Sequence, residues 1–228
     1  MSRYVDLSGP LFNGMWTYNV LPGLDTPMPE YEVDKVITID QSGFESFRFV
    51  LGSNCGTYLE TSAHLIEGAP VLDDCHLSDF IRPAVVCHVP RKEARQLIRR
   101  SELEAHCPPV GEGDALLIDC GWGSQWRSPA YVSDGPGYHP DAMRWLVEQP
   151  FSLLGVDIPC LQPPWASPDI GYDGNMLRPI LEKGVLLLAP LVNLDQVTVA
   201  RGELIALPVK AEGVCGAPCR AIFRENRA

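Results

Sequence analysis

Four short runs of consecutive apolar residues set the strongest limit on how this chain folds. They are "AVVC" at 84–87, "ALLI" at 115–118, "LLGV" at 153–156 and "VLLLA" at 185–189, and each is bordered by polar residues, glycine or proline. A run of four or five residues is short for a helix, but it suits a strand that is buried on both faces. We therefore expect these runs to form buried strands at the centre of the protein.

Further strands and three helices are expected around these runs. Alternating or β-branched and aromatic residues predict strands at 3–7, 33–39, 44–51, 56–61, 202–210 and 218–225. Helices are predicted at 101–106, where Ser101 and Glu104 have capping-box spacing, at 139–150, and at 174–184, where Pro179 should shorten or kink the helix. The chain should form a single α/β domain over residues 1–228, rich in β-structure with a few flanking helices.

The composition argues against several classes of partner. The 228 residues carry a formal net charge of −11, whereas nucleic-acid binding depends on clusters of Lys and Arg. No stretch approaches the roughly 20 apolar residues of a membrane helix, and the N-terminus does not resemble an export signal. We expect a soluble, cytoplasmic protein with eight reduced cysteines that binds a small molecule or another protein, and neither nucleic acid nor membrane.

A series of motifs resembles a known family. In order, they are "DLSGPLFNGM", "CGTYLETSAHLIEGAPVLDD", "GDALLIDCGWG", "LLGVDIP", "LVNLD" and "LPVKAEGVCGAPCRAIF". Their order and spacing resemble the kynurenine formamidase and cyclase-like family of metal-dependent hydrolases over nearly the whole chain. The resemblance implies a swivelling β/β/α (cyclase-like) fold, a homodimer, and an active site around a motif of the form HxGTHxDxPxH. In typical members the histidines and the aspartate bind zinc or manganese, together with a later His and Glu.

This motif is degenerate at residues 54–64. Asn54 stands at the first histidine, Tyr58 at the second, Glu60 at the aspartate and Ser62 at the proline, while Gly56, Thr57 and His64 are retained. The late glutamate corresponds to Ala189, and residues 171–179, where the late histidine falls, contain no histidine. Catalytic zinc needs three protein ligands, and an asparagine oxygen or a neutral phenol is a poor one. We therefore predict no metal and no other cofactor.

Strand alternation would place the altered positions together. Residues 54, 58, 60, 62 and 64 fall on one face of a strand, and Cys55 should point to the opposite face. Three interpretations are open for this cluster. It is a metal-free acid/base site, or a site that keeps a metal on Glu60, His64 and unidentified ligands, or a buried structural pair in a protein that only binds a ligand.

The first interpretation predicts a small-molecule cyclase or lyase that is metal-independent. His64, Glu60 and Tyr58 would be its catalytic residues, and Asn54 would polarise a substrate carbonyl. Acid/base catalysis suits enolisation, aldol or dehydrative cyclisation of a reactive carbonyl compound, such as a polyketide or another product of secondary metabolism. The alternatives are an amide or lactone hydrolase with altered metal ligands and a catalytically inactive ligand-binding relative.

Further candidates could complete a substrate pocket. Ser62, Trp16, Cys120 and Trp122 are predicted to bind substrate, although core packing is an equally simple role for a tryptophan or a buried thiol. The Pro-rich segments 16–31 and 159–172 are expected at a dimer interface or at the mouth of the pocket. The other four histidines, at positions 76, 88, 106 and 139, show no ligand spacing.

Overall fold

The centre of the protein is a closed ring of strands. The computed structural model describes residues 2–167, 170–172 and 174–225. Its main sheet has the order β1-β12-β11-β5-β7-β9-β10-β4, and β4 also pairs with β12, which closes seven of the strands into a barrel. The bounds are β1 Arg3–Asp6, β4 Tyr58–Glu60, β5 Ile81–His88, β7 Ala115–Asp119, β9 Leu153–Val156, β10 Leu186–Ala189, β11 Arg201–Pro208 and β12 Gly216–Glu225.

The four apolar runs form buried strands, as predicted, and these strands are neighbours in the main sheet. Strands β5, β7, β9 and β10 are parallel, with Ala84 opposite Ala115, Ala115 opposite Leu153, and Leu153 opposite Leu186. Alternate residues enter two different hydrophobic clusters, since Leu117 packs with the barrel interior and Ile118 with the outer layer. Both faces of these strands are therefore buried, which explains why the runs are apolar without interruption.

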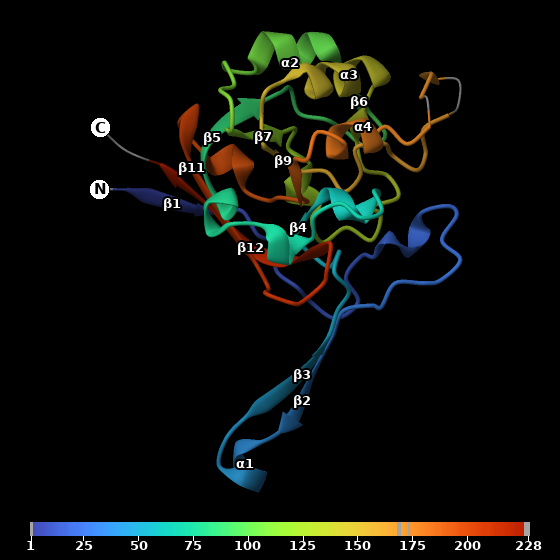
Figure 1. Ribbon diagram of the computed structural model, residues 1–228. Coiled ribbons are helices and arrows are strands. Elements are labelled where there is room, and N and C mark those ends of the chain that lie inside the picture. Colours follow the sequence, from blue (N-terminus) through green and yellow to red (C-terminus); the bar gives the residue numbers. More distant parts are fainter. Residues whose placement is uncertain (1, 168–169, 173, 226–228) are drawn as a thin grey trace.

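Three helices cover the outside of the barrel at one end (Figure 1). They are α2 Arg100–His106, α3 Pro140–Glu148 and α4 Arg178–Leu181. The predicted capping box of Ser101 and Glu104 is wrong by two residues, because Arg99 is the N-cap and its N–H donates to the carboxylate of Glu102. Pro179 lies in the first turn of α4 and so shortens the predicted helix from its N-terminal side.

A hairpin projects from the body (Figure 1). It consists of β2 Glu32–Ile37 and β3 Ser46–Val50, with the short helix α1 Ile39–Ser42 at its tip. Phe47 and Phe49 on this hairpin are 46% and 60% exposed, which is high for phenylalanine. A second small sheet pairs β6 Leu97–Ile98 with β8 Gly137–Tyr138.

The predicted fold class is confirmed. The chain forms a β-rich α/β structure with a few helices on its surface. Within the described ranges, no helix is both long and apolar enough to cross a membrane.

Candidate active site

A cavity of about 220 Å³ lies on the outer side of the barrel, beside β4 and β10. The lining is mainly apolar, and both Pro-rich segments contribute residues to it. It comprises Tyr18, Leu21, Met28, Leu65, Val156, Pro159, Cys160, Leu161, Leu177, Leu187 and Ala189, with the polar residues Asn54, Tyr58, Glu60, His64, Gln162 and Asn175. Four of the five motif positions predicted to cluster thus share one cavity, namely the altered Asn54, Tyr58 and Glu60 and the retained His64.

Strand β4 positions two of these four side chains. Tyr58 and Glu60 are alternate residues opposite Ala189 and Leu187 of β10, and all four line the cavity. Leu59 between them enters the barrel interior. On the other edge of β4, Gly216 lies opposite Glu60, and a Cβ atom at position 216 would come 3.0 Å from the Cβ of Glu60. A glycine at 216 therefore leaves room for the Glu60 side chain.

The retained residues Gly56 and Thr57 shape the turn that leads into β4. Gly56 has a φ of 67°, a left-handed conformation that favours glycine, and an added Cβ would approach Leu11 to 2.3 Å. The Thr57 hydroxyl donates to the carbonyl of Pro190 at 2.7 Å and accepts from the N–H of Gly9 at 3.1 Å. These two residues have an architectural role, so they explain why the local fold persists while the ligand positions differ.

Asn54 and His64 reach the cavity from outside the strand. Asn54 lies in the turn before Gly56, and His64 ends the 3-10 helix Ser62–His64. The prediction that one strand aligns all five positions is therefore wrong, because the strand covers only three residues. The turn also changes the expected orientation of Cys55, which lines a second cavity together with Asn54.

Glu60 is the buried acid of the cavity. It is 1% exposed, and the side-chain amide of Asn54 donates to its Oε2 atom at 3.1 Å. Burial raises the pKa of Glu60 from its ordinary 4.5 to about 8, and the hydrogen bond from Asn54 opposes this shift. At neutral pH, Glu60 is therefore mainly a protonated acid.

His64 lies at the rim, with its side chain 33% exposed. Its Nδ1 atom is 3.6 Å from Oε2 of Glu60, which is too long for a direct hydrogen bond. Burial lowers the pKa of His64 below its ordinary 6.5, so the imidazole is neutral at neutral pH. The cavity thus holds an uncharged acid and an uncharged base side by side, with the base in contact with solvent.

Tyr58 is a neutral phenol within this cavity. Its hydroxyl donates to the hydroxyl of Tyr18 at 3.4 Å, and Tyr18 donates to the carbonyl of Pro159 at 3.1 Å. Burial raises the pKa of Tyr58 well above its ordinary range. The phenol therefore lines the cavity in its neutral form and is not available as a base at neutral pH.

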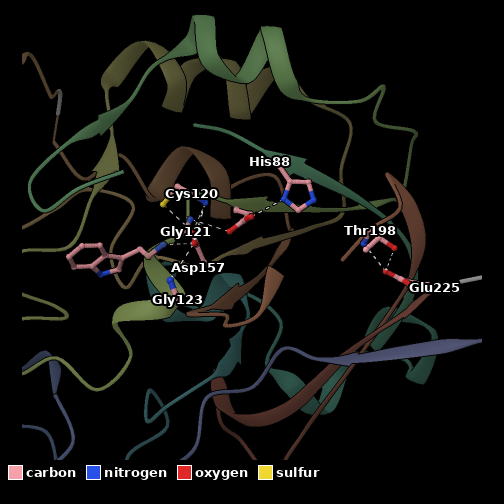
Figure 2. A network of polar contacts seen from close by, with 9 residues as sticks. His88, Cys120, Gly121, Gly123, Asp157, Thr198 and Glu225 are labelled. Carbon is pink, nitrogen blue, oxygen red and sulfur yellow. Dashed lines mark hydrogen bonds and ion pairs between the residues drawn. The ribbon is translucent and has the colours of Figure 1, made fainter. Parts of the chain in front are cut away.

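Four predicted substrate-binding residues lie elsewhere. Ser62 is turned away, and its hydroxyl donates to the carbonyl of Leu181 at 2.5 Å. Trp16 lines the second cavity, and its indole N–H donates to the carbonyl of Trp126. Figure 2 shows Cys120 beside the carboxylate of Asp157, which accepts from the N–H groups of Cys120 and Trp122. Neither Cys120 nor Trp122 is among the residues that line either of these two cavities.

Residues far along the chain complete the lining and were not predicted individually. Leu177 and Asn175 come from the stretch 171–179, where the family resemblance places a late histidine, and Gln162 comes from the second Pro-rich segment. Asp173 in that stretch lies outside the described residues, as do residues 168–169 of the second Pro-rich segment. The richness in proline and aromatic residues was the sequence signal for these segments.

The donor atoms of the cavity do not fit a catalytic zinc or manganese ion. Asn54 directs its amide N–H toward Glu60, and its Oδ1 atom accepts from the hydroxyl of Ser53 at 2.7 Å. In the described lining, Tyr58 is a neutral phenol, the side chain of Ala189 has no ligand atom, and the residues of the usual ligand types are Glu60, His64 and Cys160. Burial raises the pKa of Cys160 to about 12, so this side chain stays a thiol and does not supply the thiolate that zinc binds. Across the part of the chain that the structure describes, no group of three or more His, Cys, Asp or Glu residues could hold a metal ion.

The comparisons with known proteins agree with this fold. The sequence pattern of the family described as "Putative cyclase" matches residues 5–163. The chain belongs to this family. The match confirms the resemblance seen in the sequence.

Relatives with named activities match this chain over almost its whole length. A kynurenine formamidase of Bacillus cereus is 28% identical over 228 residues, with 98% of each chain covered. An isatin hydrolase of Roseibium aggregatum is 25% identical over 243 residues and covers 96% of this chain and 90% of its own. Among solved structures, isatin hydrolase A from Labrenzia aggregata, bound to benzyl benzoate, superimposes with a TM-score of 0.84 at 22% identity, covering 99% of this chain and 94% of its own. That likeness confirms the cyclase-like fold.

Proposed function

We propose that this protein is an enzyme that transforms a small, uncharged carbonyl compound by acid/base catalysis. The observation that carries the proposal is the placement of the buried carboxyl of Glu60 3.6 Å from the imidazole of His64 in one mainly apolar cavity. Neutral pH leaves each group in the form that its role requires, an acid that donates and a base that accepts.

The cavity favours a substrate without a net charge. No lysine or arginine is among the described residues of its lining, and its one carboxyl group is held protonated by burial. A charged ligand would lose its hydration there without gaining an ionic partner. A volume of about 220 Å³ suits a ring of five or six atoms with small substituents.

Residues of the cavity carry out the proton transfers. His64 accepts a proton from water or from a carbon next to the carbonyl, while Glu60 donates its proton to the carbonyl oxygen. Asn54 holds the Glu60 carboxyl in place, and the phenol of Tyr58 contacts the substrate. A general acid or base of this kind contributes roughly 10²–10⁴-fold to the rate. These proton transfers do not depend on a metal, and the donor atoms of the site do not fit one.

The relatives favour hydrolysis as the overall reaction. The comparisons include proteins named as a formamidase and as hydrolases, which supports hydrolysis of a reactive amide or lactone over the cyclase or lyase reaction expected from the sequence. Ring closure or elimination is the second candidate. The arrangement of Glu60 and His64 supports it, because enolisation needs only these two proton transfers.

Substrate screening with matched variants tests this proposal. Uncharged aromatic amides, lactones and dicarbonyl compounds are assayed with the native protein, with His64→Gln, and with the exposed control His106→Gln. We expect turnover to fall roughly 10²–10⁴-fold in His64→Gln and to stay unchanged in the control. The mass of the product separates the two reaction classes, since hydrolysis adds the elements of water to the substrate, whereas elimination or dehydrative ring closure removes them. Tight binding without turnover of any compound would instead support an inactive ligand-binding relative.

A further inference from the structure

A second cavity lies next to the proposed active site. It has a volume of about 150 Å³ and is built from the segment 16–31 and the turn at 52–55. Its walls include the aromatic rings of Trp16, Tyr18 and Tyr31. None of the described residues that line it carries a charge, so this cavity also favours an uncharged group.

The two cavities share part of their walls. Tyr18, Met28 and Asn54 line both of them, so the two cavities lie side by side. An engineered apolar cavity of about 150 Å³ is known to bind benzene, which makes the second cavity large enough for one aromatic ring. Pockets for larger ligands usually measure about 300–1,000 Å³, so a two-ring compound would need both cavities.

The aromatic walls are held in place before any ligand binds. The ring of Trp16 stacks on Tyr131 with 4.9 Å between the ring centroids. The loop that carries these residues is pinned by Asn19, whose side-chain amide donates to the carbonyl of Met28 at 3.0 Å and accepts from its N–H at 2.7 Å. A preformed cavity of this kind binds a flat ring without a large ordering cost.

A polar chain connects the second cavity to the catalytic acid. The Ser53 hydroxyl donates to Oδ1 of Asn54, and the amide of Asn54 donates to Glu60. Asn54 therefore stands at the junction of the cavities and contacts the group that would donate to the carbonyl. A ligand that spans both cavities would place its reactive carbonyl on one side of Asn54 and its second ring on the other.

We propose that the substrate has two lobes, a carbonyl-bearing lobe in the first cavity and a flat, uncharged aromatic ring in the second. This inference rests on the proposed function for the first lobe. The second lobe rests on the aromatic walls and on the shared boundary. Trp16 and Tyr31 bind the ring, so they select the substrate without taking part in proton transfer.

The test compares two uncharged amides that differ by one ring, benzamide and N-benzylbenzamide. Calorimetry measures their binding to the native protein, to Cys55→Phe, which fills the second cavity, and to the size-matched control Cys55→Ser. We expect the native protein and the control to bind N-benzylbenzamide at least about tenfold more tightly than benzamide. Cys55→Phe should lose this preference while its affinity for benzamide stays within about twofold.

A second variant guards against a folding defect in Cys55→Phe. Gly52→Leu also fills this cavity, and a Cβ atom at position 52 meets only Pro29, at an ordinary 3.4 Å. Equal affinity for the two amides, no measurable binding of either, or an equal loss of both in the filled variants would overturn the two-lobe proposal. The proposed function fails separately, through unchanged turnover in His64→Gln, because calorimetry reports binding whether or not the protein turns over a substrate.

Discussion

The side-chain amide of Asn54 donates a hydrogen bond of 3.1 Å to the buried carboxyl of Glu60. In the family motif, these two positions belong to metal ligands. In this protein, the side chains at these positions form a hydrogen bond with each other. An amide donor stabilises the carboxylate form only in part, so burial still dominates and the pKa of Glu60 stays raised. With asparagine and glutamate at these two ligand positions, the site has a buried acid whose side chain is oriented by a hydrogen bond.

The pH dependence of turnover should show both groups. Activity requires protonated Glu60 and neutral His64, so kcat/KM should follow a bell-shaped curve. Its upper limb should fall near pH 8, where Glu60 loses its proton, and its lower limb should lie below the ordinary histidine pKa of 6.5. A pH–rate profile in buffers of constant ionic strength measures both limbs, and a rate that keeps rising above pH 8 would contradict the role of Glu60 as the acid.

Removing the Asn54 amide should move one limb of that profile. In Asn54→Ala, the Glu60 carboxylate loses its hydrogen-bond donor, so its pKa should rise further and the upper limb should shift to higher pH. The lower limb should stay in place, because it reports His64. A parallel fall in rate at every pH, with both limbs unmoved, would show that Asn54 does not position this acid.

Glu60 should lower the stability of the protein as pH rises. Its pKa is about 8 in the folded protein and near the ordinary 4.5 in the unfolded chain, so the folded state holds a proton that the unfolded chain releases between these values. Stability therefore falls as pH rises through this range. Glu60→Gln removes this pH-dependent loss of stability, because glutamine does not titrate. The carbonyl of the substituted side chain can still accept a hydrogen bond from Asn54.

Urea denaturation at about pH 5 and about pH 9 measures this difference. Relative to the native protein, Glu60→Gln should gain at least about 1 kcal/mol more at the higher pH, since one pKa unit corresponds to about 1.4 kcal/mol. The exposed control Glu67→Gln should show no such gain. An equal effect of Glu60→Gln at both pH values would mean that Glu60 is not protonated in the folded state.

The projecting hairpin should take part in a homodimer. Phe47 and Phe49 are exposed on an arm of two strands, and exposed apolar side chains of this size mark contact surfaces. We expect light scattering at micromolar concentration to give the mass of a dimer, and the double variant Phe47→Asp, Phe49→Asp to give a monomer. A native monomer at that concentration would remove the dimer from this account.

The strands were predictable because the burial of a strand determines the pattern of apolar residues within its own short segment. Each apolar run became a buried strand, and the alternation of Tyr58, Leu59 and Glu60 placed the first and last together. Closure of the barrel was not predictable in the same way. It depends on the pairing of Leu59 with Ala217, residues far apart in the chain that carry no mutual signal in one sequence.

The candidate site was predictable where residues follow a regular strand and not where the chain turns. Trp122 follows Gly121, whose φ of 81° reverses the backbone, and its N–H then binds Asp157. Periodicity does not extend through such a turn, so Trp122 could not be placed from spacing alone, whereas Cys120 follows the alternation of Leu116 and Ile118 into the outer cluster. Asn54 and His64 did reach the cavity, but through a turn and a 3-10 helix on either side of β4.

The central claim is that Glu60 and His64 carry out the chemistry of this site without a catalytic metal. The most direct measurement is elemental analysis of the purified, active protein, combined with kcat/KM before and after treatment with a chelator. The account predicts well under one equivalent of zinc or manganese per chain and a kcat/KM that chelation does not change. Stoichiometric metal in the native protein, with activity that chelation abolishes and the metal restores, would contradict it.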